Sequence, residues 1–160
     1  MGLWRKIAQT GRVAEPAPER APGEPPAKAA ELAGSVQIRH VDAGSCNGCE
    51  VEIASAFGPV YDAERYGARL VASPRHADAL LVTGPVARNM EVALQRTYDA
   101  VAEPRLVIAL GDCARNCGAF AGAYGVVGAV SDVVPVDVEV PGCPPEPEAI
   151  VTALRGLTGR

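Results

Sequence analysis

Leu106-Val107-Ile108-Ala109-Leu110-Gly111-Asp112-Cys113 is the stretch of this sequence that decides the fold. Its five consecutive apolar residues end at a glycine, which is typical of a strand that is covered on both faces within a parallel sheet. A similar apolar run over residues 79–83 ends at Gly84-Pro85, and residues 36–41 alternate in polarity as a strand does. We therefore expect these three segments to belong to one sheet.

Segments with helical character lie between these strands. Residues 50–57 form one or two helical turns that stop at Gly58-Pro59, residues 90–101 have apolar side chains at helical spacing, and residues 146–157 close the chain as a helix. Further strands are expected over residues 68–72 and 133–140, whereas the Gly-rich region 118–128 is expected to be irregular. Strands that alternate with helices predict an α/β protein with an open parallel sheet.

The N-terminal part of the chain differs in composition from the rest. Residues 1–12 predict a short amphipathic helix with Leu3, Trp4 and Ile7 on one side, and residues 13–28 are rich in Pro, Ala, Glu and Gly, as an extended linker is. We expect an amphipathic segment and flexible linker over residues 1–33 and a single folded domain over residues 34–160, because 160 residues are enough for one ordinary domain.

Composition limits the partners and the compartment. The net charge of −4 and an aromatic content of 4% provide neither a basic face nor a stacking surface, so nucleic acid is not an expected partner. No apolar run approaches the roughly 18 residues that span a bilayer, no signal peptide is visible, and the cysteine count of five is odd. We expect a cytoplasmic protein whose association with a membrane is peripheral or through partner subunits.

The cysteines follow the predicted strands. Cys46 and Cys49 come after the strand at residues 36–41, Cys113 after the strand at 106–110, and Cys143 after the strand at 133–140. In open parallel sheets ligands bind beyond the carboxyl ends of the strands, so these four thiols are expected to meet. Four thiolates are the number that an iron-sulfur cluster or a structural zinc ion requires. We expect them to hold one 4Fe-4S cluster.

Other interpretations of the cysteines stay open at this point. A zinc site usually has two Cys-x-x-Cys pairs, and this chain has one, Cys46-Asn47-Gly48-Cys49. A thioredoxin-like dithiol pair would leave Cys113 and Cys143 unexplained. Cys117 lies four residues after Cys113 and is either a spare thiol or a substitute ligand. Plain burial of four cysteines that all follow strands is the remaining alternative.

In four motifs the chain resembles the family that contains the 20 kDa subunit of respiratory complex I and the small subunits of membrane-bound nickel-iron hydrogenases, including formate hydrogenlyase. The motifs are Val41-Asp42-Ala43-Gly44-Ser45-Cys46-Asn47-Gly48-Cys49, Thr83-Gly84-Pro85-Val86-Ala87-Arg88-Asn89-Met90, Gly111-Asp112-Cys113-Ala114 and Pro135-Val136-Asp137-Val138-Glu139-Val140-Pro141-Gly142-Cys143-Pro144-Pro145. The resemblance covers residues 36–157. It implies a flavodoxin-like fold with helices on both faces of the sheet and a single 4Fe-4S cluster on Cys46, Cys49, Cys113 and Cys143.

The first motif separates the two branches of this family. Complex I subunits have adjacent cysteines, whereas Asn47-Gly48 separates them here, as in the hydrogenase small subunits. The resemblance therefore implies a small subunit that relays electrons between a catalytic large subunit and ferredoxin-like subunits of an oxidoreductase complex. Such a complex contains an integral membrane subunit and lies at the inner face of the cell membrane. The chain by itself is expected to have no substrate chemistry.

Alternatives remain at the level of function. A complex I type protein would pass electrons to quinone, and a protein of another class would be a thioredoxin-like dithiol protein or a zinc-stabilised scaffold. Glu52 stands three positions after Cys49, where the family has a carboxylate, which implies a role in proton movement. Cys117 departs from the complex I pattern, which has glycine there. His40 and His76 belong to no motif, and Asp112 is expected to cap a turn.

Overall fold

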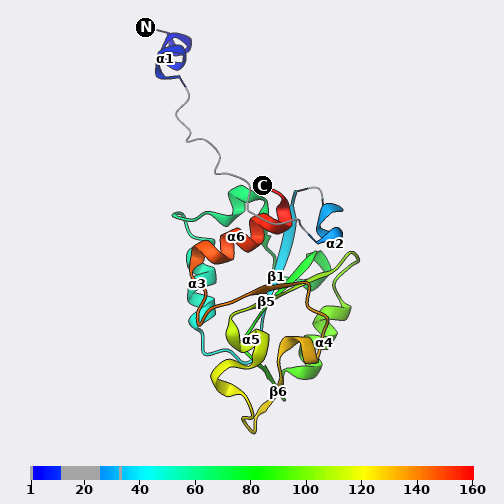
Figure 1. The fold of residues 1–160 in the computed structure, drawn as a ribbon. Coiled ribbons are helices and arrows are strands. Elements are labelled where there is room, and N and C mark those ends of the chain that lie inside the picture. Colours follow the sequence, from blue (N-terminus) through cyan, green and yellow to red (C-terminus); the bar gives the residue numbers. More distant parts are fainter. Residues whose placement is uncertain (1, 12–25, 33) are drawn as a thin grey trace.

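The structure, a computed structural model, describes residues 2–11, 26–32 and 34–160. Its centre is a five-stranded parallel sheet with the strand order β2-β1-β3-β5-β7 (Figure 1). Counted along the chain, this is the 2-1-3-4-5 order of flavodoxin-like proteins. The predicted α/β class and flavodoxin-like sheet are confirmed. The strands are Val36–Asp42 (β1), Ala68–Leu70 (β2), Ala79–Thr83 (β3), Leu106–Leu110 (β5) and Val138–Val140 (β7).

Helices cover both faces of the sheet and enclose two hydrophobic cores. Helices α3 (Gly48–Ala56) and α6 (Pro147–Thr158) pack with Leu81 and Ile108 on one face. Helices α4 (Glu91–Asp99) and α5 (Asp112–Asn116) contribute to the core on the other face, which contains Val82 and Val107. Neighbouring residues of a strand point to opposite faces, which explains why β5 is apolar at every position and why β3 is apolar up to Thr83 at its end.

The register of the sheet aligns the carboxyl ends of its inner strands. Thr83 at the end of β3 pairs with Asp42 of β1 and with Leu110 of β5, and Leu110 pairs with Val140 of β7. Each of the cysteine-bearing loops begins directly after one of these positions. The loops therefore start from a single edge of the sheet.

Two predictions about the second half of the chain need correction. The strand predicted over residues 133–140 is formed only at Val138–Val140, because the amides of Val133 and Val134 bond back to the carbonyl of Val130 in a turn. The region 118–128 is not wholly irregular. It contains a 3-10 turn, Gly118–Phe120 (η3), and strand β6 (Val126–Gly128), which pairs antiparallel with β4 (Val86–Ala87). Three further 3-10 turns are Ala63–Tyr66 (η1), Pro74–His76 (η2) and Val130–Asp132 (η4).

Two helices lie within the described residues of the N-terminal segment, 2–11 and 26–32. In α1 (Leu3–Thr10) every residue is exposed, including Leu3, Trp4 and Ile7. In α2 (Ala27–Ala30), Ala29 is buried in the core that α6 shares, so contacts with the sheet begin before the predicted domain start at residue 34. The part of the predicted linker at residues 12–25 lies outside the described residues. No helix in the ranges 2–11, 26–32 and 34–160 combines the length and apolar character that crossing a membrane requires.

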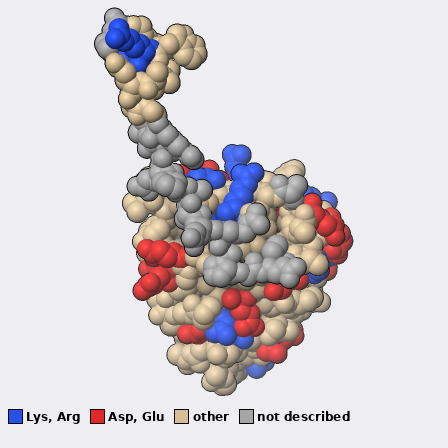
Figure 2. Space-filling model, turned by 45° about the horizontal axis from the view of Figure 1, so that its top comes forward, with Lys and Arg blue, Asp and Glu red and all other residues tan. Residues whose placement is uncertain are grey.

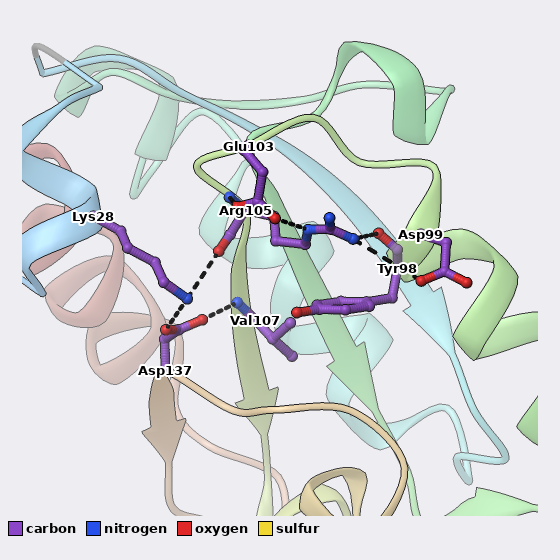
Figure 3. Close-up of polar contacts among 7 residues, drawn as sticks. All are labelled: Lys28, Tyr98, Asp99, Glu103, Arg105, Val107 and Asp137. Carbon is purple, nitrogen blue, oxygen red and sulfur yellow. Dashed lines mark hydrogen bonds and ion pairs between the residues drawn. The ribbon is translucent and has the colours of Figure 1, made fainter.

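The start of β5 is held by a group of polar side chains at the edge of the sheet opposite the cysteine loops (Figure 3). Asp137 accepts the Val107 N–H through Oδ2 at 2.9 Å, and its Oδ1 accepts from Lys28 Nζ of α2, also at 2.9 Å. Arg105 lies with its guanidinium 4.7 Å from the Tyr98 ring centroid and pairs with Glu103 at 2.7 Å. One carboxylate thus joins α2, β5 and the residue before β7.

Candidate functional site

A cavity of about 130 Å³ lies at the carboxyl edge of the sheet, where the three cysteine-bearing loops meet. The four cysteines predicted as ligands all contribute to its wall, and so does Gly84 of the loop that follows β3. The lining residues are Ser45, Cys46, Gly48, Cys49, Gly84, Asp112, Cys113, Gly142, Cys143 and Pro144. Residues separated by almost 100 positions in sequence are therefore neighbours at this site.

The loop that carries Cys46 is shaped by its polar neighbours. Asp42 at the end of β1 accepts the backbone N–H groups of Gly44 at 2.9 Å and of Ser45 at 2.7 Å through Oδ1. Asn47 adopts a left-handed conformation with φ of 67°, which Asn tolerates better than most residues. The chain then enters α3 at Gly48, and this places Cys49 in the first turn of that helix.

Glycine makes room for the sulfur atoms. Gly111 has φ of +88°, and a Cβ at this position would lie 2.8 Å from Cys49 Sγ. A Cβ at Gly118, which has φ of +47°, would lie 3.1 Å from Cys113 Sγ. Any larger residue at these positions would both strain the backbone and displace a thiol. The lack of a side chain at these two positions lets the backbone lie close to two of the four sulfurs.

The loop that carries Cys143 is tied to the loop that carries Cys113. Asp112 Oδ1 accepts the Gly142 N–H at 3.0 Å, and the Asp112 N–H donates to the Gly142 carbonyl at 2.8 Å. Arg115 bonds to Asp112 at 3.3 Å and to Glu139 at 2.9 Å. Asp112 therefore holds two cysteine loops together through its side chain and its backbone.

The thiols act on one another electrostatically. Burial, followed by the charge of Glu50 and by the Cys113, Cys46 and Cys143 thiols, raises the pKa of Cys49 to about 12. Burial and the thiols of Cys143 and Cys46 also raise the pKa of Cys113. These thiols are therefore protonated at neutral pH. Because metals bind thiolates, loading of the site must release protons.

A polar cluster of four side chains adjoins the cavity. The Glu50 carboxylate accepts hydrogen bonds from Ser45 Oγ at 2.6 Å and from Thr83 Oγ1, and His40 Nε2 lies 3.4 Å from its Oε1. Burial lowers the pKa of His40, against the opposing effect of Glu50. Sequence reasoning missed this cluster, because its members come from β1, the Cys46 loop, α3 and β3 and share no motif.

Cys117 and Glu52 lie apart from the cavity wall. Cys117 follows α5 in a left-handed conformation and is half-buried, which raises its pKa. Glu52 lies one turn into α3 and is partly exposed. Within the part of the chain that the structure describes, neither residue is among those that line the cavity. Their predicted roles, as a substitute ligand and in proton movement, stay predictions.

Known proteins resemble this chain over most of its folded part. The family model of the NADH ubiquinone oxidoreductase 20 Kd subunit matches residues 46–157. A probable membrane-bound hydrogenase subunit, mbhJ, of Pyrococcus furiosus is 49% identical over 114 residues, which are 71% of this chain and 68% of that protein. Formate hydrogenlyase subunit 7 of Escherichia coli is 46% identical over 115 residues, 72% of this chain but only 45% of that protein. One NADH-quinone oxidoreductase subunit of Symbiobacterium thermophilum is 47% identical over 107 residues, 66% of this chain and 59% of that protein.

Solved structures show the same fold. A chain of the archaeal membrane-bound sulfane sulfur reductase, a respiratory membrane complex, superposes with a TM-score of 0.70 at 31% identity and covers 81% of this chain and 72% of its own. The [NiFeSe] hydrogenase from Desulfovibrio vulgaris Hildenborough has a TM-score of 0.58 at 20% identity, covers 78% of this chain and 63% of its own, and supports the fold alone. The resemblance expected from the four motifs is confirmed. This chain belongs to the family of the NADH ubiquinone oxidoreductase 20 kDa subunit, and the named relatives are subunits of oxidoreductase complexes.

Proposed function

We propose that this chain is the electron-transfer small subunit of a membrane-associated oxidoreductase complex of the hydrogenase type, and that Cys46, Cys49, Cys113 and Cys143 hold one 4Fe-4S cluster. The observation that carries the proposal is that these four thiols, from three separate loops, line one cavity at the carboxyl edge of the sheet. When bound, such a cluster takes up and releases single electrons.

The residues of the cavity fit a cluster better than a single ion. One zinc ion would need all its sulfurs at about 2.3 Å from a common point. In residues 2–11, 26–32 and 34–160, no three His, Cys, Asp or Glu side chains are placed to hold one ion. A cluster, by contrast, takes one thiolate at each of its irons, so its ligands stand farther apart. The clearance that Gly111 and Gly118 provide beside Cys49 and Cys113 supports the same fit.

The position of the cavity suits transfer of electrons between subunits. Cys46 and Cys143 are exposed, whereas Cys49 and Cys113 are partly buried, so the site lies at the surface with one side against the sheet. We propose that a catalytic large subunit and a ferredoxin-like subunit of the complex approach this side. An integral membrane subunit would hold the assembly at the inner face of the cell membrane, with the exposed apolar residues of α1 assisting.

A complex I type role, in which electrons pass to quinone, is the second candidate. The 47% identity with the NADH-quinone oxidoreductase relative supports it. The separation of Cys46 and Cys49 by two residues favours the hydrogenase type. The large subunit that co-purifies with this chain distinguishes them, because two Cys-x-x-Cys pairs in that protein indicate a nickel-iron site and their absence indicates the quinone type. Glu52 is proposed to assist proton movement in either case.

Anaerobic purification followed by iron and acid-labile sulfide analysis tests the cluster. We expect ~4 iron and ~4 sulfide per chain and an electron paramagnetic resonance signal on reduction. Serine at Cys46, Cys49, Cys113 or Cys143 should lower the iron content strongly, whereas Cys117→Ser, the matched control, should keep it. A colourless protein with one zinc per chain would overturn the proposal. Full dithiol reductase activity in a Cys113→Ser, Cys143→Ser double variant would do the same.

A further inference from the structure

Glu50 is connected to both ends of the loop that joins the proposed ligands Cys46 and Cys49. Glu50 follows Cys49 directly in the first turn of α3. Its Oε2 accepts a hydrogen bond from Ser45 Oγ at 2.6 Å, and Ser45 directly precedes Cys46. Ser45 Oγ in turn accepts the Asn47 N–H at 3.0 Å. The carboxylate therefore has a defined position beside Cys46 and Cys49.

From the sheet, Thr83 holds the other carboxylate oxygen, and His40 holds Thr83. The Thr83 hydroxyl, which is fully buried at the end of β3, donates to Glu50 Oε1. Because a hydroxyl has one hydrogen to donate, the His40 Nε2 atom, 3.0 Å from Thr83 Oγ1, must be the donor in that contact. Both oxygens of Glu50 are thus fixed by side chains from separate elements.

Glu50 and Asp112 differ in how their negative charges are compensated. Asp112 is paired with the guanidinium of Arg115 at 3.3 Å. Among the described residues, the ionisable side chain within ion-pair distance of Glu50 is His40, whose pKa burial lowers, so that the imidazole is neutral near pH 7. Glu50 is about one-fifth exposed, and partial burial strengthens electrostatic effects over short distances.

We propose that Glu50 lowers the reduction potential of the cluster held by Cys46, Cys49, Cys113 and Cys143. A fixed negative charge beside a redox group disfavours the arrival of a further electron, and charge near a cluster is one of the factors that set its potential. The inference rests on the proposed function. It assigns Glu50 a role in setting the potential, which is separate from the proton movement proposed for Glu52.

Redox titration of the full-length protein, followed by electron paramagnetic resonance, tests the inference. Glu50→Gln keeps the shape of the side chain and removes its charge. We expect the midpoint potential to become more positive by a roughly tenfold change in the reduction equilibrium, about 59 mV for a one-electron couple. Glu50→Asp, which keeps the charge, should shift the midpoint less. Glu64→Gln is the matched control. Glu64 lies in η1, which precedes the amino end of β2, so this variant removes one negative charge at the opposite edge of the sheet and should leave the midpoint potential unchanged.

Iron content separates the possible outcomes. An unchanged midpoint in a Glu50→Gln protein with full iron content would overturn the role of Glu50 and leave the proposed function intact. A wild-type protein without iron would overturn the proposed function itself. If Glu50→Gln does not retain iron, His40→Arg decides, because it places a cation beside the intact carboxylate. A more positive midpoint in His40→Arg supports the inference, and an unchanged one contradicts it.

Discussion

At the scale of single residues, Gly111 combines two constraints that can be separated by experiment. Its positive φ disfavours any side chain by about 1–2 kcal/mol, and a Cβ there would lie 2.8 Å from Cys49 Sγ. Gly111→Ala is expected to lower both the free energy of unfolding and the iron content. Gly122→Ala is the matched control, since Gly122 has φ of +75° and no atom within 4 Å of the added Cβ. Equal iron loss in both variants, measured beside urea denaturation, would contradict the proposed contact with Cys49.

His40 is a second single residue with a testable effect, because it should make the free energy of unfolding depend on pH. Burial holds the pKa of folded His40 below the 6.5 of an unperturbed histidine. Between that lowered pKa and 6.5 the unfolded chain binds more protons than the folded one, so the free energy of unfolding should fall as the pH falls through this window. The His40→Gln variant should lose this part of the dependence. Urea denaturation at a series of pH values checks it, and identical slopes for both proteins would show that His40 does not contribute.

At the scale of elements, Asp137 connects the start of β5 with α2. Asp137→Ala leaves the buried Val107 N–H without its acceptor, which costs about 1–3 kcal/mol. Lys28→Ala removes an ion pair in which the lysine side chain is 44% exposed, which is worth about 1 kcal/mol or less, and a long hydrogen bond of 3.4 Å to the Arg105 carbonyl. We therefore expect Asp137→Ala to destabilise the protein more than Lys28→Ala in urea denaturation. Equal losses would mean that the bond to Val107 N–H contributes little.

Elements also differ in how well local sequence predicts them. The strands β3 and β5 follow from their continuous apolar runs, residues 79–82 and 106–110, since both of their faces are covered. The strand β7 is shorter than its β-branched residues suggest, because Val133 and Val134 are used in a turn that closes on Val130. The pairing of β4 with β6 joins two segments of only a few residues, and no alternation long enough to predict it exists in either.

At the scale of the whole molecule, the N-terminal segment divides into a part that packs on the sheet and a part that does not. Deletion of residues 1–25 removes α1 but keeps α2, so the iron content and the melting temperature should be unchanged. Attachment to membranes or to the complex should weaken, because the exposed Leu3, Trp4 and Ile7 are lost. Figure 2 shows that α1 also bears basic atoms, whereas the face of the sheet domain in that view mixes acidic and basic side chains. Co-sedimentation with membranes measures the attachment.

A longer deletion provides the comparison. Removal of residues 1–33 also removes the buried Ala29 and the bond from Lys28 to Asp137, and it should lower stability by roughly 1–2 kcal/mol. Serine at Leu3, Trp4 and Ile7 in the intact chain should weaken attachment as much as the shorter deletion does. Loss of iron on deletion of residues 1–25 would mean that the N-terminal segment takes part in forming the site.

By itself, the sequence determined the class of fold, the central strands and the meeting of Cys46, Cys49, Cys113 and Cys143. Apolar periodicity is a local property, and the carboxyl ends of parallel strands share one edge, so cysteines after those strands become neighbours. The tertiary structure alone decided that Glu50 is held by Ser45 and Thr83, that Gly111 lies against Cys49, and that α2 packs before residue 34. These contacts depend on how distant elements pack against one another, and no local pattern of residues encodes that placement.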